Sequence, residues 1–407
     1  MVPHKATSHF LTFAAVFVAL AVPSLAFGRA MVGVTLGLAF LAILFAVPIK
    51  QIVSEMTGRM SRPFVMLLGV VAVASAVNIP FSLRIGLSFE AWGRTWLLLG
   101  LISFVCFSLK DRLELIFKVM AVAFLCVVAL NLYQLHVDHK LNKLLLNGLL
   151  LLLPIVVYQS VKDRTPLWVG VGVASVVLYI LAVLDSQSKV SLLGMAIMMS
   201  AGVSLFSLSR FSKKQAILIA VAVVAVLVAI LAWWLPGQLY SSSAENMSMT
   251  PVPVWLIDFH RQLIWTFGFE LFQESPWVGF GLNASNYHPL ANQPVTEYFV
   301  GRFGSLSGFE NITALPSHPH NWLVEMLIDG GLIATLPVVM LVTYVVVTSV
   351  RRYLTTQSAC LLIFIMVQLT YWGTGLFNFS FWSTWWQATY FLASFLMLSG
   401  YVRSQEG

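Results

Sequence analysis

Charged residues are scarce in this chain. Only 10% of its 407 residues are Asp, Glu, Lys or Arg, and 59% are hydrophobic, against about 25% and roughly 45–50% in soluble domains. The mean hydropathy is +0.88. The three cysteines all fall inside apolar runs, so they indicate neither a disulfide framework nor a cysteine metal site. This composition predicts an all-α polytopic membrane protein.

Several motifs of energy-coupled and hydrolytic enzymes are also missing. The chain has no Asp-x-Asp pair for a metal-bound sugar nucleotide, no Walker A loop for ATP and no Gly-x-Ser-x-Gly elbow for a nucleophilic serine. The net charge of +7 follows membrane topology and is not read as a nucleic-acid footprint. We therefore expect no cofactor, no metal centre and no nucleic-acid partner.

Apolar runs of about 20 residues, long enough to cross a bilayer, recur along the chain. About twelve spans are expected near 9–27, 30–49, 63–80, 92–109, 115–135, 144–161, 167–184, 190–209, 215–235, 331–350, 357–378 and 382–402. A cytoplasmic N-terminus leaves most of the 23 Lys and Arg residues on the inner side, as the positive-inside rule requires. Both termini are then cytoplasmic. Tryptophans near the span ends are expected in an interfacial belt, namely Trp92, Trp96, Trp233, Trp234, Trp382, Trp385 and Trp386.

One long interruption separates the spans. The chain divides into transmembrane helices over 1–235, a large periplasmic loop over 236–319, and a re-entering helix with the last spans over 320–407. Half of the eight histidines lie in this loop or at its exit, namely His260, His288, His318 and His320. Titratable groups gathered beside a membrane indicate a functional site. We expect short helices in the loop, one of them over 258–274.

Arg261 lies in register with the apolar residues of that expected helix. It is either a structural arginine, salt-bridged or reaching out to water, or a guanidinium presented to a phosphate. Lys189 is a second candidate cation for a diphosphate, and its alternative role is a simple ion pair with Asp185. Arg84 and Arg302 are weaker candidates of the same kind.

Two histidines stand one residue apart at the loop exit. Pro319 suits the first turn of a helix, with Ser317 or His318 as its cap, so His320 is expected to open that helix. A lone histidine there is more often a cap or a satisfied polar group. The pair favours general-base work, and the residues alone leave open whether His318 or His320 is the base. Metal binding is disfavoured, since no outer carboxylate or cysteine partner is evident.

Three segments in order resemble the O-antigen ligase family, within the wider group of bacterial O-antigen ligases and polymerases. They are Arg261–Trp265, the Pro-x-x-Gly-x-Gly run inside Ser275–Leu282, and His320–Leu323 followed by Gly331. The resemblance implies a GT-C-like inner-membrane glycosyltransferase that is independent of metal and ATP and acts at the periplasmic face. Its donor would be a glycan on undecaprenyl diphosphate, and its acceptor a sugar hydroxyl of lipid A–core oligosaccharide, both held among membrane lipids.

The resemblance also implies roles for individual residues. His320 would be the base or positioning group for the acceptor hydroxyl, and Arg261 would engage the donor diphosphate. Lys189 stands where the family has an arginine, which leaves a point charge but loses the bidentate fork. With no obvious nucleophile, we expect one inverting displacement. A polymerase or a protein O-oligosaccharyltransferase with the same donor stays open, as does a lipid-linked glycan transporter, although the spans show few of the polar groups that transport requires.

Overall fold

The chain folds into a bundle of long helices in the computed structural model. The structure describes residues 4–138, 142–186, 188–212, 257–302, 306 and 308–406, with a few positions between 214 and 229. Within these ranges it holds helices and turns and one isolated bridge, which confirms the all-α prediction. The helices are α1 (His4–Leu20), α2 (Ala30–Ala46), α3 (Ile49–Gly58), α4 (Arg62–Val77), α5 (Ile85–Ser108), α6 (Leu113–Asp138), α7 (Lys143–Asp163), α8 (Pro166–Asp185), α9 (Lys189–Arg210), α11 (Phe259–Glu274), α12 (Val295–Tyr298), α13 (Trp322–Thr356), α14 (Ala359–Thr374) and α15 (Thr384–Glu406).

Seven of the described helices are long and apolar enough to cross a membrane. The pair α2 and α3, bent by 107°, would add an eighth; Pro48 stands at the bend, where it favours a helix start rather than a continuation. Each predicted span outside 215–235 overlaps a helix of the structure. The span over 215–235 falls largely outside the described residues, so the count of about twelve stays a prediction.

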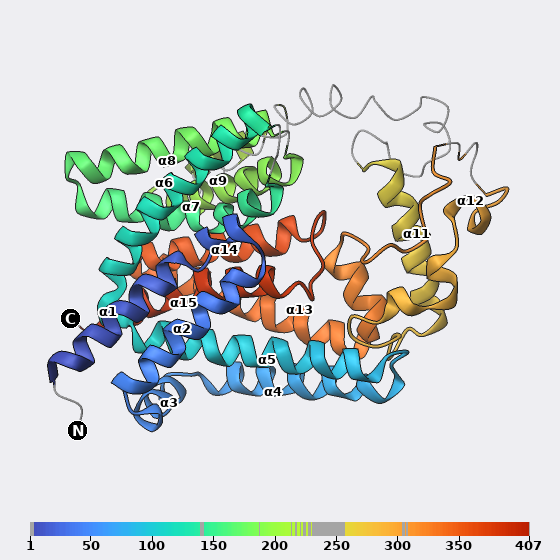
Figure 1. The fold of residues 1–407 in the computed structure, drawn as a ribbon, viewed down its shortest axis with the longest axis horizontal. Helices are drawn as coiled ribbons and strands as arrows, with labels where there is room; N and C mark the ends of the chain where they lie inside the picture. The colour runs from blue at the N-terminus through green and yellow to red at the C-terminus, as the bar shows by residue number, and fades with distance from the viewer. Residues whose placement is uncertain are drawn as a thin grey trace.

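The long helices run side by side, with both termini at one end of the bundle and α11 and α12 at the other (Figure 1). Helix α7 is the most enclosed of these seven helices, with 78% of its apolar stretch buried. Leu149, Leu150, Leu151 and Leu152 have no exposed surface, because α6, α8, α9, α14 and α15 pack around this helix. In lipid, such a centre is held by close side-chain packing rather than by exclusion of water.

Three of the tryptophans expected at the membrane interface lie in the core instead. Trp382, Trp385 and Trp386 are between 2% and 5% exposed. The ring of Trp386 stacks on Tyr371 at 5.0 Å, and the indole nitrogen of Trp382 donates to Asp329 at 2.6 Å. The interfacial prediction is wrong for these three, because neighbouring helices supply ring and carboxylate partners in place of lipid head groups.

Helix α11 builds a smaller core at the end of the bundle. Asp258 caps it by accepting a hydrogen bond from the backbone N–H of Arg261 at 3.0 Å. The helix predicted over 258–274 is therefore confirmed. Its buried face, with Phe259 and Phe267, packs against Phe299 and against Ile328 of α13. This second core ties the long segment before α13 to the start of α13.

Helix α13 is broken at Gly331, which has φ 58° and ψ −166°. In an unbroken helix the N–H groups of residues 332 and 333 would donate to the carbonyls of residues 328 and 329. The backbone of segment 276–281 inserts at this break, between the two N–H groups and the two carbonyls, and forms a hydrogen bond with each of the four. The four bonds are Phe280 N to Ile328 O at 2.9 Å, Gly281 N to Asp329 O at 2.8 Å, Leu332 N to Pro276 O at 2.9 Å and Ile333 N to Trp277 O at 3.1 Å.

Two positions of this junction require glycine for steric reasons. A Cβ atom on Gly331 would lie 2.3 Å from the carbonyl carbon of Trp277, and one on Gly279 would lie 2.6 Å from that of Asp329. Both residues also have positive φ, which other residues adopt at a cost. The Pro-x-x-Gly-x-Gly run thus docks the segment before α13 onto the broken helix.

Candidate active site

The segment 317–321 joins the second core, which contains α11, to α13. Helix α13 begins at Trp322, and Asn321 caps it by accepting from the N–H groups of Leu323 at 2.9 Å and Val324 at 3.2 Å. The prediction that Pro319 lies in the first turn, with Ser317 or His318 as its cap, is therefore wrong. Asn321 stands directly before the first helical residue, where its side-chain oxygen reaches the free N–H groups, whereas Ser317 and His318 lie too far back along the chain.

His320 lies just before the helix rather than inside it. Its φ of 55° is in the left-handed region, which is uncommon for residues other than glycine, although histidine is among the more tolerant. Such conformations cluster at functional sites, where the surrounding contacts hold them in place. His320 is thus held out of helical register by the cap that follows it.

A backbone carbonyl sets the orientation of the His320 ring. The Nδ1 atom lies 3.1 Å from the carbonyl oxygen of Asn378. Because a carbonyl only accepts, Nδ1 carries the hydrogen and Nε2 of the neutral ring is the acceptor. The ring of His318 lies 4.2 Å away between centroids, with its own Nδ1 at 2.9 Å from the hydroxyl of Ser317.

Burial keeps both histidines neutral. It lowers the pKa of His318 to about 4, with the neighbouring His320 as the next cause. Burial and the charge of Arg261 lower the pKa of His320 below its ordinary 6.5, while the hydrogen bond to Asn378 opposes this shift. At neutral pH each ring can therefore accept a proton, and His320 is the one with an oriented Nε2.

Arg261 comes to the same place from the first turn of α11. Its Nη1 atom lies 2.5 Å from Oδ2 of Asp258, and its side chain is 30% exposed. One turn further along, the indole nitrogen of Trp265 donates to the carbonyl oxygen of Pro319 at 2.9 Å. The ring of Trp265 also contacts Phe377, with centroids 6.0 Å apart. These contacts hold the start of α11 against the His320 segment.

Lys189, the first residue of α9, adds a cation from the other side. The charges of Asp258, Arg261 and Lys143 all act on its ammonium group. These effects indicate that the ends of α7, α9 and α11, far apart in the sequence, approach one another. Lys143 was not among the predicted site residues, because nothing in its sequence neighbourhood separates it from an ordinary residue at the start of a span.

The comparisons with known proteins cover this same part of the chain. Residues 174–339 match the family model described as O-antigen ligase. The match confirms the resemblance drawn from the motifs, over somewhat less than half of the 407 residues. Lys189, Arg261 and His320 all lie inside this matched region.

Two curated relatives agree with the family match. Proteins of Rickettsia conorii and Rickettsia bellii, both named as candidate polysaccharide ligases, are 25% and 26% identical over 218 and 221 residues. Each alignment covers 52% of this chain. It covers 46% and 47% of the respective relative, so the chain spans about half the length of the curated relatives it matches.

The matched region also holds Arg302, which follows α12 and binds α11 at a different point from Arg261. Both terminal nitrogens of its guanidinium bind the carboxylate of Glu270, and Nη1 does so at 3.2 Å. Glu270 also accepts from the hydroxyl of Tyr298 at 2.7 Å. Glu270 is nine residues beyond Arg261, about 13 Å along the helix. The structure does not bring Arg302 to His320, and its role as a substrate ligand stays a prediction.

Arg84 lies before α5, outside the matched region. Its guanidinium carbon is 4.9 Å from the centroid of the Tyr287 ring. Among the described contacts, none joins Arg84 to His320 or to Arg261. Its role as a substrate ligand likewise stays a prediction.

Two buried carboxylates next to the site escaped the sequence analysis. Glu325 and Asp329 are 3% and 1% exposed, and their spacing puts them on one face of α13. Asp329 accepts from the backbone N–H groups of Asn283 at 2.9 Å and Ser285 at 3.2 Å. The available signal was the two carboxylates one turn apart in the helix expected to re-enter the membrane. A carboxylate in such a helix needs buried partners.

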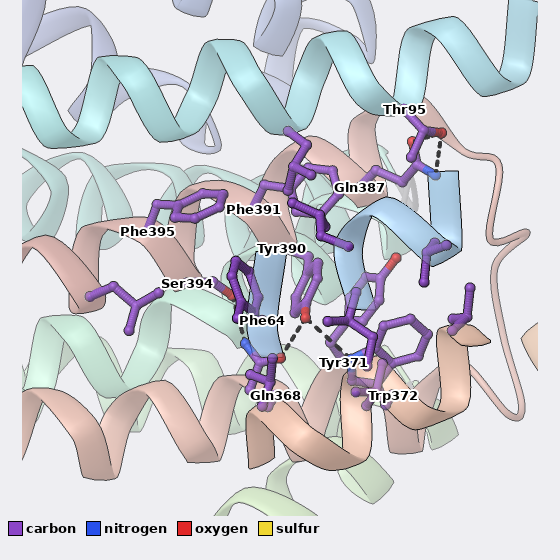
Figure 2. Close-up of a pocket in the computed structure, with 18 of the residues that line it drawn as sticks. Phe64, Thr95, Gln368, Tyr371, Trp372, Gln387, Tyr390, Phe391, Ser394 and Phe395 are labelled. Carbon is purple, nitrogen blue, oxygen red and sulfur yellow. Dashed lines mark hydrogen bonds between the residues drawn. The ribbon is translucent and has the colours of Figure 1, made fainter. Parts of the chain in front are cut away.

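A cavity of about 170 Å³ lies among α4, α5, α13, α14 and α15 (Figure 2). Its walls are mainly aliphatic and aromatic. The polar groups in it bind one another: the hydroxyl of Tyr390 donates to Gln368 at 2.5 Å, and Gln368 donates to Ser394 at 2.9 Å (Figure 2). Trp372 and Phe381 line it as well, and they flank the segment whose carbonyl holds His320.

Proposed function

We propose that this chain is a glycosyltransferase of the O-antigen ligase type in the bacterial inner membrane. It would take a glycan from undecaprenyl diphosphate and join it to a sugar hydroxyl of lipid A–core oligosaccharide at the periplasmic face. The observation that carries this proposal is the approach of Arg261 to an oriented neutral histidine, His320, through the docking of α11 on the His320 segment. Lys189 adds a cation that acts on Arg261 and Asp258. The family match supports the transfer of a polysaccharide.

His320 is the base of this proposed reaction. Its Nε2 atom takes the proton of the acceptor hydroxyl as the oxygen attacks the anomeric carbon of the donor sugar. The bond from that carbon to the diphosphate oxygen breaks, and the electron pair leaves with undecaprenyl diphosphate. His320 suits this step better than His318, whose pKa of about 4 makes it a weaker base.

Arg261 and Lys189 meet the negative charge that grows on the leaving diphosphate. The donor is already activated, so no ATP is required. Because Arg261 is partly exposed and held by Asp258 at 2.5 Å, its guanidinium is oriented before the substrate arrives. A fixed donor of this kind stabilises charge without a further cost of reorganisation in the transition state.

The site favours inversion of the anomeric configuration. Asp258 is the carboxylate that acts on both His320 and Lys189, and both of its oxygens bind Arg261, through the backbone N–H and through Nη1. A carboxylate engaged in this way is a poor nucleophile. We therefore infer one displacement with inversion; NMR of the linkage in donor and product tests this, and net retention would refute it.

The apolar cavity offers a place for part of the lipid chain of the donor. It lies among membrane-spanning helices and adjoins the segment 372–381, which contacts the His320 segment. Its polar groups are already paired with one another, so an apolar occupant would leave no hydrogen bond unmade.

The experiment that tests the function is lipopolysaccharide profiling in a cell that lacks this protein. The cell is complemented at matched expression with the wild type, with His320→Ala or with Arg261→Ala. We expect the wild type to restore long glycans on lipid A and both variants to fail. Full restoration by both variants would refute the site. A wild type that changes glycan length without transfer to lipid A would identify a polymerase, and transfer to protein would identify a protein O-oligosaccharyltransferase.

A further inference from the structure

The segment between α14 and α15 is bound to the start of α13 at several points. The N–H of Trp322 donates to the carbonyl oxygen of Gly375 at 3.0 Å, and His320 donates to Asn378 at 3.1 Å. Two residues further on, the hydroxyl of Ser380 and the N–H of Phe381 donate to the carboxylate of Glu325. These last bonds measure 2.5 and 2.6 Å.

Both carboxylate oxygens of Glu325 accept hydrogen bonds from this segment. It is 3% exposed, and a buried carboxylate without hydrogen bonds would be strongly destabilising. Its partners are a hydroxyl and a backbone N–H from the segment 375–383 rather than groups of its own helix. Since Ser380 is only two residues from Asn378, fixing Ser380 and Phe381 restricts where the Asn378 carbonyl can lie.

We propose that Glu325 is a positioning residue for the transfer reaction. It holds the segment 378–381 so that the Asn378 carbonyl accepts the Nδ1 hydrogen of His320, which leaves Nε2 as the proton acceptor. This rests on the proposed function, in which His320 is the base. Glu325 acts through the segment and through His320, and it does not touch the substrate.

Glu325 affects the pH profile of the reaction through the pKa of His320. The groups that act on the His320 ring are His260 and Arg261 on α11, Asp258 at its N-cap and the Asn378 carbonyl. The ring of His318 lies beside it at a tilt of 54°, with centroids 4.2 Å apart. Loss of the carbonyl acceptor removes a contact that favours the protonated ring, so the pKa of His320 falls further. The acidic limb of the kcat profile then moves to lower pH, while the plateau falls because the ring is no longer oriented.

The test uses the purified full chain in lipid nanodiscs with a lipid-linked glycan donor and a lipid A–core acceptor. Glu325→Leu removes both hydrogen bonds, Glu325→Gln keeps the acceptor for Ser380, and Ser380→Ala removes that one donor. We expect kcat to fall roughly tenfold to a hundredfold in Glu325→Leu, the range seen when the partner that orients a functional histidine is lost. Smaller falls are expected in the other two variants, and the donor KM should stay near the wild-type value.

Asn78→Ala is the matched control. Asn78 has no exposed surface and donates to the carbonyl oxygen of Gly330 at 2.6 Å, so it joins α4 to α13 without touching the segment 375–383. It should lower Tm but leave kcat per folded molecule and the acidic limb unchanged. If Glu325→Leu does not fold, Glu325→Gln and Ser380→Ala still report the shift.

The outcomes separate the inference from the proposed function. Wild-type kcat and an unshifted acidic limb in the folded Glu325 and Ser380 variants, beside an inactive His320→Ala, would overturn the positioning role alone. Full activity of His320→Ala, or no transfer by the wild type, would overturn the proposed function and the inference with it. A fall in kcat that tracks Tm equally in Asn78→Ala would reduce Glu325 to a structural residue.

Discussion

Replacement of Gly331 by alanine tests the junction between the segment 276–281 and α13. Gly331 has φ 58° and ψ −166°, a region that alanine enters at a cost of about 1–3 kcal/mol. The added Cβ atom would also lie 2.3 Å from the carbonyl of Trp277, so that carbonyl must move away. The hydrogen bond that this carbonyl accepts from Ile333 N–H is then lost, together with the adjacent one from Leu332 N–H to the Pro276 carbonyl. Each loss costs about 1 kcal/mol of stability. We expect Gly331→Ala to destabilise the protein by roughly 3–5 kcal/mol.

Gly301→Ala provides the matched control. Gly301 also has a positive φ, of 70°, but a Cβ atom there would meet nothing within 4 Å. Its substitution therefore carries only the conformational cost, about 1–2 kcal/mol. Thermal unfolding of both variants in the same nanodiscs gives the comparison through Tm, with transfer activity measured in parallel. Equal losses of Tm in the two variants would refute the reasoning, because the contact with the inserted segment would then contribute nothing.

Three further predictions concern the chemistry. The kcat of the wild type should fall at acidic pH, with a midpoint below pH 6.5. Burial and the charge of Arg261 lower the pKa of His320, and protonation of its ring removes the base. A midpoint above pH 6.5 would contradict this. Arg261→Lys keeps the charge but loses the fork that binds phosphate, so kcat/KM for the donor should fall roughly tenfold to a hundredfold, and wild-type kinetics would exclude bidentate binding. EDTA should leave transfer unchanged, since side-chain cations meet the diphosphate charge; a loss restored by added Mg²⁺ would refute that role.

The helices were predictable from the sequence because each depends on its own residues. An apolar run long enough for a bilayer forms a helix whatever surrounds it, since its backbone groups have no other partner in lipid. Helix α11 was predictable for a similar reason, because Asp258 and the periodic apolar residues are local signals. The motifs at Arg261, Gly279–Gly281 and His320 also indicated the O-antigen ligase family, which residues 174–339 match.

Local signals were insufficient where a distant segment supplied the partner. Asn321 displaced Ser317 and His318 as the cap of α13, and His320 consequently lies outside the helix. Trp382 was expected at the membrane interface, yet it is buried against Asp329. The position of Trp382 depended on a group brought near by folding, whereas the Asn321 cap is a local contact that the sequence analysis missed.

The sequence by itself determined the helical class, the main apolar segments and the residue types that the proposed diphosphate donor and hydroxyl acceptor would require. Only the tertiary structure decided which of them meet. Arg261, Lys189 and His320 come from α11, α9 and the segment before α13, and their electrostatic coupling exists because these ends converge. Glu325 acquires its importance through a segment 55 residues away. Hydrogen bonds and charges act over a few ångströms in space, so distance along the chain does not reveal them.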